Sequence, residues 1–116
     1  DMEPSINVTY LKELSSGDQA FEKELLDLFL NDTAKDIQLI KDSFEQKNIT
    51  KIREISHKIK PSLQVIGAIF LQQKIDLLKR KIMEDEVYDE ILCQDVLDEF
   101  NKCESEINDL LTKDYA

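Results

Sequence analysis

The chain of 116 residues has few of the residues that make turns, with only two glycines and two prolines. It also has no tryptophan and a single histidine. Charged residues make up 34% of the chain and hydrophobic residues 41%, a composition rich in helix formers. The sequence therefore predicts an all-helical protein, and its length fits one domain with a single modest core.

Long apolar runs are missing as well. No run approaches the roughly 20 residues that a membrane helix needs, and we expect no signal peptide before the domain. We therefore expect no direct membrane contact by this segment. This expectation does not extend to any part of the protein outside it.

Cysteine is scarce, and neither the pattern CxxC nor a histidine-rich spacing occurs, so we expect no metal site. The two cysteines, Cys93 and Cys103, fall in one predicted helix. Ten residues of helix separate them by roughly 15 Å, which is too far for a disulfide. We expect buried or half-buried thiols in a reducing compartment, which favours a cytoplasmic location.

Positive charge is in short supply overall but is concentrated in one segment. The net charge of −10 argues against a nucleic-acid partner, since phosphate contacts need a cationic surface. Residues 49–82 nevertheless hold eight basic and two acidic side chains, so this segment is +6 and the remainder is −16.

Apolar residues recur every three or four positions in four stretches, which is the pattern of amphipathic helices. The stripes run from Leu26 to Phe44, from Ile52 to Ile66, from Leu71 to Ile82 and from Leu92 to Leu110. Four helices with short connections can bury such stripes only against one another, which predicts an antiparallel four-helix bundle. A short additional helix is expected over residues 9–14. We expect residues 1–8 to be loosely ordered and residues 9–116 to form the bundle domain.

The single histidine, His57, points away from the apolar stripe of its predicted helix. A helix turns 100° per residue, so Ile55 and Ile59 lie about 160° from His57. His57 should therefore face solvent in the middle of a bundle helix. The following residues lie within about 60° of it: Arg53, Lys60, Pro61, Gln64 and Ala68.

The basic charge around His57 has two interpretations. It can hold neighbouring acidic helices together, or it can form an anion-facing site on His57 and Lys60. Pro61 removes the hydrogen bond that would reach the carbonyl of His57, so we expect the helix to bend there. The bend either tilts the imidazole outward or is a tolerated kink without a role.

The stretch HKIKPSLQVIGA, residues 57–68, resembles the histidine-containing phosphotransfer (HPt) domain of bacterial and fungal phosphorelays. That family has an exposed histidine, a hydrophobic residue two positions on, a lysine three positions on and a glycine at the tenth position. Its helix order and lengths match this chain from Tyr10 onward. The chain departs from the pattern at Pro61, where glycine is usual, and at Lys79, where a residue that hydrogen-bonds the imidazole is common.

The resemblance implies that His57 accepts a phosphoryl group from an aspartyl phosphate and that Lys60 neutralises phosphoryl charge. The implied partners are response-regulator receiver domains, a hybrid sensor histidine kinase, or both. No cofactor is implied in this chain, and Mg²⁺ is expected on the partner receiver. We expect Gly67 to allow a close approach. The expected partner surface comprises Arg53, Pro61, Gln64, Ala68 and Lys79.

Several alternatives stay open. A non-catalytic module could dock signalling partners without carrying phosphate, as Pro61 and Lys79 suggest. A helical adaptor unrelated to signalling could bind an acidic partner through its basic segment. An independent enzyme is not expected, because the sequence shows no nucleophile–base pair, metal cluster or glycine-rich phosphate loop. Both a free-standing cytoplasmic protein and the cytoplasmic C-terminal domain of a membrane-bound hybrid kinase fit the sequence.

Overall fold

The computed structural model describes residues 3–115, and every regular element in that range is a helix. Residues 1 and 2, part of the segment expected to be loosely ordered, and residue 116 lie outside the described residues. The elements in chain order are α1 (Thr9–Ser15), α2 (Gln19–Leu28), the π-helical turn η1 (Phe29–Thr33), α3 (Ala34–Glu45), α4 (Ile49–Ile66), α5 (Ile69–Asp85) and α6 (Glu90–Asp114).

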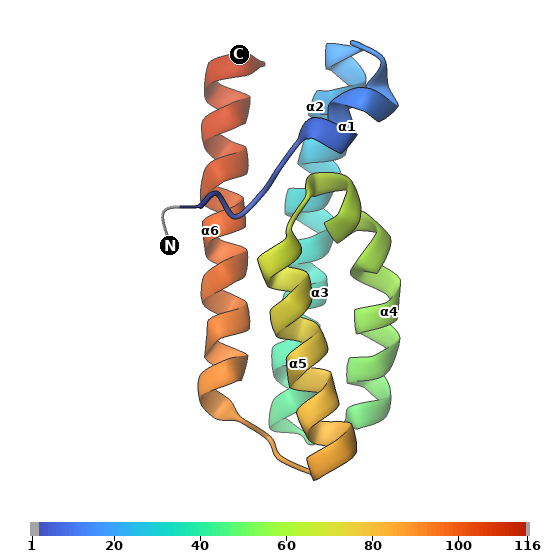
Figure 1. Ribbon diagram of the computed structural model, residues 1–116, viewed down its shortest axis with the longest axis vertical. Coiled ribbons are helices and arrows are strands. Elements are labelled where there is room, and N and C mark those ends of the chain that lie inside the picture. Colours follow the sequence, from blue (N-terminus) through green and yellow to red (C-terminus); the bar gives the residue numbers. More distant parts are fainter. Residues whose placement is uncertain (1–2, 116) are drawn as a thin grey trace.

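The helices form the predicted antiparallel bundle (Figure 1). Helices α2 and α3, joined through η1, make one long rod, and α4, α5 and α6 are the other three members. Successive members run in opposite directions, and α3 packs on α4, α4 on α5, α5 on α6 and α6 on α3. Short α1 covers one end of the bundle, so the prediction of four helices with an additional N-terminal helix is confirmed.

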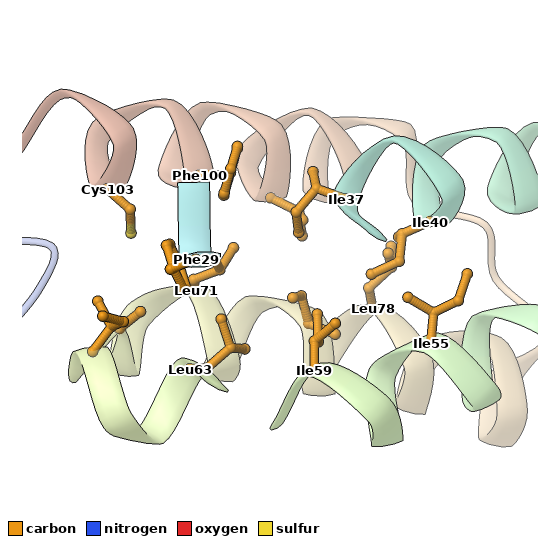
Figure 2. Close-up of a cluster of buried hydrophobic side chains, with 14 of the residues drawn as sticks. Phe29, Ile37, Ile40, Ile55, Ile59, Leu63, Leu71, Leu78, Phe100 and Cys103 are labelled. Carbon is orange, nitrogen blue, oxygen red and sulfur yellow. The ribbon is translucent and has the colours of Figure 1, made fainter. Parts of the chain in front are cut away.

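The apolar stripes meet along the bundle axis (Figure 2). Side chains from the four members interdigitate there, and Phe29 lies beside Phe100 with ring centroids 6.2 Å apart. All the predicted stripe residues are buried except Leu110, which is half-buried. Burial of this apolar surface is the main favourable term in folding, so the stripes set the rotation of every helix, including α4.

The helix starts follow from polar side chains that accept hydrogen bonds from the first turn. Asp18 accepts from the Phe21 amide, Asn48 from the Lys51 amide and Asp89 from the Leu92 amide. The cap Asn48 lies nine residues before His57, so it helps to fix the register of α4.

The first rod differs from the single amphipathic α-helix that the stripe from Leu26 to Phe44 predicts. The turn η1 widens it at residues 29–33, where Phe29 and Thr33 are both buried. This turn contains Asn31, Asp32 and Thr33, which are weak helix formers, so a departure from α-helical geometry costs little there. Packing of Phe29 against α6 therefore outweighs the local preference for α-helix.

The segment before α1 also differs from expectation, because residues 3–8 are tied to the bundle. The Ser5 amide donates to both Glu106 carboxylate oxygens at 2.9 and 2.8 Å, and the Ile6 amide donates to Oε1 at 3.0 Å. Both residues are buried, and the Asn7 amide donates to the Ile66 carbonyl at 2.9 Å. We call residues 3–8 the N-terminal strap. The strap joins α6 to the end of α4.

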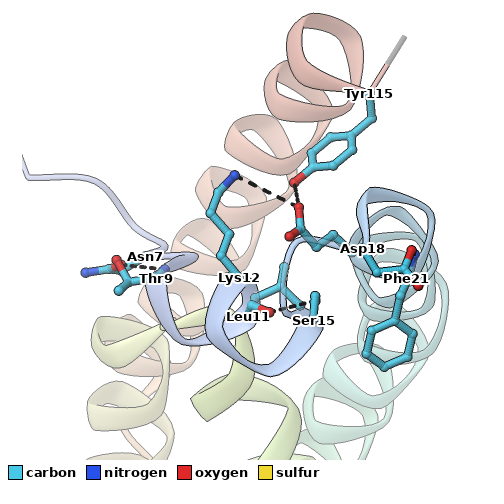
Figure 3. A network of polar contacts seen from close by, with 9 residues as sticks. Asn7, Thr9, Leu11, Lys12, Ser15, Asp18, Phe21 and Tyr115 are labelled. Atoms are coloured by element: carbon cyan, nitrogen blue, oxygen red, sulfur yellow. Dashed lines mark hydrogen bonds and ion pairs between the residues drawn. The ribbon is translucent and has the colours of Figure 1, made fainter.

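Helix α1 is secured by a buried carboxylate on α2 (Figure 3). Glu22 accepts a hydrogen bond from the Tyr115 hydroxyl at 2.6 Å, and the Lys12 ammonium lies 4.0 Å from the same oxygen. Burial, together with the Glu22 carboxylate beside it, raises the pKa of Tyr115 to about 12. The neutral phenol therefore acts as a donor that links the C-terminal end of α6 to α2.

Cys93 and Cys103 are both buried and unpaired in α6, which agrees with the expected burial. Burial raises the pKa of the Cys93 thiol, and it raises that of Cys103 to about 12. Such thiols are poor nucleophiles, so their role in the described structure is packing. Within residues 3–115, none of the helices has the length and apolar character needed to cross a membrane.

Candidate functional site

His57 lies in the middle of α4 and is exposed to solvent. Its neighbours in the stripe, Ile55 and Ile59, are buried in the core. The predicted opposition of the imidazole to the isoleucine stripe is therefore confirmed. An exposed imidazole in mid-helix is accessible to a second protein, and an imidazole nitrogen that carries a lone pair can act as a nucleophile.

A groove between α4 and α5 contains the imidazole. Its volume is about 420 Å³. Two basic side chains, Arg53 from α4 and Lys79 from α5, line the groove together with His57. Arg53 is exposed and Lys79 is half-buried. The expected placement of Lys79 near His57 on the following helix is thus confirmed. The remaining lining residues are Thr50, Glu54 and Met83.

The eight basic residues of the +6 segment separate into two sets. Five enter ion pairs with described residues: Lys51, Lys58, Lys74, Arg80 and Lys81. Three of these pairs hold the bundle together. Lys58 reaches Asp36 on α3 at 3.0 Å, Lys74 reaches Glu99 on α6 at 3.4 Å, and Lys81 reaches Asp89 at 2.7 Å.

The second set comprises Arg53, Lys60 and Lys79, which enter no ion pair with any residue between 3 and 115. We call these three the unpaired cations. Lys60 is exposed and lies three residues after His57, close to one helical turn away. Three of the paired cations therefore join helices, as the first interpretation expects. The unpaired cations leave positive charge around His57, and the anion-facing site on His57 and Lys60 stays a prediction.

Pro61 lies within α4, which continues through it as a regular helix to Ile66. The bend expected at His57 stays a prediction. The ring of Pro61 is exposed and lines a second groove of about 250 Å³, on the side of α4 that faces α2 and η1. Other residues of that groove are mostly apolar: Leu25, Leu28, Phe29, Asp32, Thr33, Ser62, Val65 and Ile66.

Gly67 does permit a close approach, and the approaching segment belongs to the chain itself. Its φ of +70° is left-handed and ends α4. A Cβ atom built at Gly67 would lie 2.2 Å from the Asn7 carbonyl oxygen, so the N-terminal strap occupies the space that a side chain would need. Within residues 3–115, the function of Gly67 is to seat the strap at the end of α4.

Ala68 corrects the predicted partner surface. It is 0% exposed and lies after the left-handed turn, as the N-cap of α5. Its amide donates to the Leu63 carbonyl at 2.9 Å. The expected exposure assumed that α4 continues through residue 68, whereas the chain reverses at Gly67 and turns the methyl group inward. Gln64, in contrast, is exposed on the same face as His57.

The site also contains residues that sequence reasoning missed. Thr50 and Met83 line the groove of His57, and Leu25 and Leu28 line the groove beside Pro61. Thr50 lies two helical turns before His57 and Met83 one turn after Lys79, so helical spacing could have identified both. Leu25 and Leu28 come from another helix, and their position depends on packing. No group of three or more histidine, cysteine or acidic side chains within residues 3–115 could hold a metal ion.

The Hpt domain family model matches residues 24–113, which is most of the chain. The chain therefore belongs to the Hpt domain family, and membership implies histidine phosphotransfer in a phosphorelay, with receiver domains and kinases as the classes of partner. No curated protein and no solved structure matches the chain.

Proposed function

We propose that this domain is a phosphorelay intermediate that takes a phosphoryl group from one receiver domain onto His57 and passes it to another. The observation that carries the proposal is the position of His57, the chain's single histidine, exposed in mid-helix beside three unpaired cations. Because histidine phosphotransfer needs a histidine that a partner can reach, no other residue can fill this role.

In the proposed transfer, an imidazole nitrogen of His57 attacks the phosphorus of the receiver's aspartyl phosphate. A nitrogen–phosphorus bond forms, the phosphorus–oxygen bond to the aspartate breaks, and the carboxylate leaves with the electron pair. The ring gives up its proton to solvent. Donation to the second receiver reverses these steps, with that receiver's aspartate as the attacking group.

Phosphoryl transfer depends mostly on positioning and on neutralisation of charge. The receiver is expected to supply Mg²⁺ and its own acidic pocket. We propose that Lys60, one turn from His57, faces the phosphoryl oxygens during transfer, when negative charge moves between the two proteins. The domain itself then needs no general base, since the neutral imidazole is already a nucleophile.

We propose a docking surface that centres on His57 and includes Arg53, Pro61, Gln64 and Lys79. Ala68, which is buried, has no part in it. The cations lie toward the α5 side, whereas Pro61 leads into the apolar groove formed with α2 and η1. A receiver pocket that is acidic and ringed by apolar residues fits such a surface, because contact area and electrostatic steering come from different sides of His57.

A relay assay tests the proposal. The domain is incubated with a receiver that carries labelled phosphate and with Mg²⁺, and a second unphosphorylated receiver is added later. We expect acid-labile label to appear on the domain and then to move to the second receiver. Binding of the receiver without any label on the domain would instead indicate a docking module that carries no phosphate. Label on the domain with no onward transfer would refute the intermediate role.

A further inference from the structure

We propose that Lys79 and Arg53 hold the phosphoryl group after it has arrived on His57, so that they stabilise the phosphorylated form of this domain. The inference rests on the proposed function, because it requires that His57 carry phosphate. It differs from a docking role, since it applies to the isolated domain with no receiver present.

The first support is the groove itself. His57, Arg53 and Lys79 line one surface depression between α4 and α5, and the two cations come from different helices. Lys79 is half-buried and Arg53 is exposed, so neither side chain is shut away from the groove that both line. A phosphoryl group on the imidazole would therefore lie at a groove that is also lined by two cations.

The second support is the local charge balance. Neither Arg53 nor Lys79 has an ion-pair partner among residues 3–115. The acidic residue of the groove, Glu54, lies 3.7 Å from the ammonium of Lys51, which lies outside the groove lining. Two groove cations are therefore available to a phosphoryl group, which carries up to about two negative charges.

The third support is the chemistry of a lysine at this place. An ammonium group donates hydrogen bonds and accepts none, so Lys79 cannot accept one from the N–H of an unmodified imidazole. It can donate to phosphoryl oxygens. Lys79 therefore interacts more favourably with the phosphorylated state than with the free histidine, and such a difference shifts an equilibrium toward the favoured state.

The experiment uses the whole chain and a small phosphoryl donor, phosphoramidate. An imidazole nitrogen of His57 attacks the phosphorus, the phosphorus–nitrogen bond of phosphoramidate breaks, and ammonia leaves with the proton. The phosphorus-31 signal of the modified domain is then followed against pH, and its titration midpoint reports the charge around the phosphoryl group. No receiver is present, so docking does not contribute.

Four variants distinguish the effect of the groove cations on the titration midpoint from the effect of the protein's net charge. We expect Lys79→Gln and Arg53→Gln to move the midpoint to higher pH by roughly 0.2 to 0.7 units each, the size expected for a partly exposed ion pair. Lys79→Arg should restore the wild-type midpoint. The matched control is Arg80→Gln, because Arg80 is outside the groove and pairs with Glu84 at 3.7 Å. It should leave the midpoint nearly unchanged.

Equal midpoints in the wild type, Lys79→Gln and Arg53→Gln would overturn the inference while leaving the proposed function intact. A shift in Arg80→Gln as large as in Arg53→Gln would overturn it too, because the effect would then come from net charge. If His57 accepted phosphate neither from phosphoramidate nor from a phosphorylated receiver, the proposed function itself would fail. The two failures are therefore distinguishable.

Discussion

His57 in the middle of α4 and Gly67 at its end are ten residues apart and have opposite surroundings. Around His57 the helix is exposed, and its nearby cations Arg53 and Lys60 have no ion-pair partner among residues 3–115. Around Gly67 the chain is covered by the N-terminal strap, and the next residue, Ala68, is fully buried. The histidine is therefore available for chemistry, whereas the glycine shapes the fold that holds α4 in place.

This difference predicts that substitutions of His57 and of the unpaired cations alter phosphotransfer and leave stability intact, whereas substitutions near Gly67 do the opposite. The predictions below test that separation. They are ordered by the expected effect on phosphoryl transfer.

His57→Gln should abolish phosphate acceptance completely, because the chain has no other histidine. Its free energy of unfolding should change by less than about 0.5 kcal/mol, since an exposed polar side chain is exchanged for another. Labelled transfer from a phosphorylated receiver and urea denaturation measure the two quantities. Label retained by the variant would place the chemistry elsewhere.

Lys60→Ala should slow transfer within the complex by about tenfold, while docking changes less, because a positioned cation acts most when charge is passing beside it. Rapid-quench kinetics at saturating receiver separate the two steps. Weakened docking with a normal transfer rate would make Lys60 a binding residue only.

The matched control for Lys60 is its neighbour Lys58, which pairs with Asp36 at 3.0 Å. Because the Asp36 side chain is only 7% exposed, Lys58→Ala leaves a carboxylate with little water to replace the lost partner. We expect a loss of roughly 1 to 3 kcal/mol in stability with normal transfer in the folded protein. Slower transfer in both variants would show that the paired and unpaired cations do not differ in role.

Reversing Arg53 and Lys79 together to Glu should lower the association rate with a receiver several-fold and flatten its salt dependence, because these cations steer the encounter with an acidic pocket. Stopped-flow binding at several salt concentrations measures this. Asp98 lies exposed on α6, away from the proposed surface, so Asp98→Lys should alter binding little. Disruption by Asp98→Lys alone would place the docking face on another side of the bundle.

Gly67→Ala should have the smallest effect on transfer and a large effect on stability. The new methyl group meets the Asn7 carbonyl, and the left-handed φ of +70° disfavours any residue with a Cβ. We expect a loss of roughly 2 to 3 kcal/mol. Thermal unfolding measures it, and transfer should remain near normal below the unfolding transition. Unchanged stability would mean that the strap does not depend on Gly67.

Much of this arrangement could be predicted because helical periodicity carries it. The isoleucines of α4 recur at three and four residues, and this spacing fixes the outward position of His57 relative to the core. Lys79 on the following helix was identified from the resemblance to the HPt pattern and not from periodicity. Periodicity failed at Ala68, since an angle of 100° per residue has no meaning once the chain leaves the helix at Gly67.

Other features depend on contacts between distant residues. Nothing near Ser5 indicates that its amide binds Glu106, which lies 101 positions away. Likewise, residues 58 and 60 are both lysines close to His57. The packing of α3 against α4 pairs one of them, Lys58, with Asp36. The sequence thus shows where positive charge is concentrated, whereas the fold determines which of these cations have no ion-pair partner among the described residues and can contact a second molecule.

The most direct test of the central claim is to observe the imidazole of His57 itself. The nitrogen-15-labelled domain is incubated with a phosphorylated receiver and Mg²⁺, and its histidine ring nitrogens are followed by NMR. Because the chain has one histidine, the spectrum is unambiguous. We predict that one ring nitrogen shifts and shows coupling to phosphorus, and that both changes reverse when a second receiver is added. Unchanged ring nitrogens while the receiver loses its phosphate would contradict the claim that His57 carries the phosphoryl group.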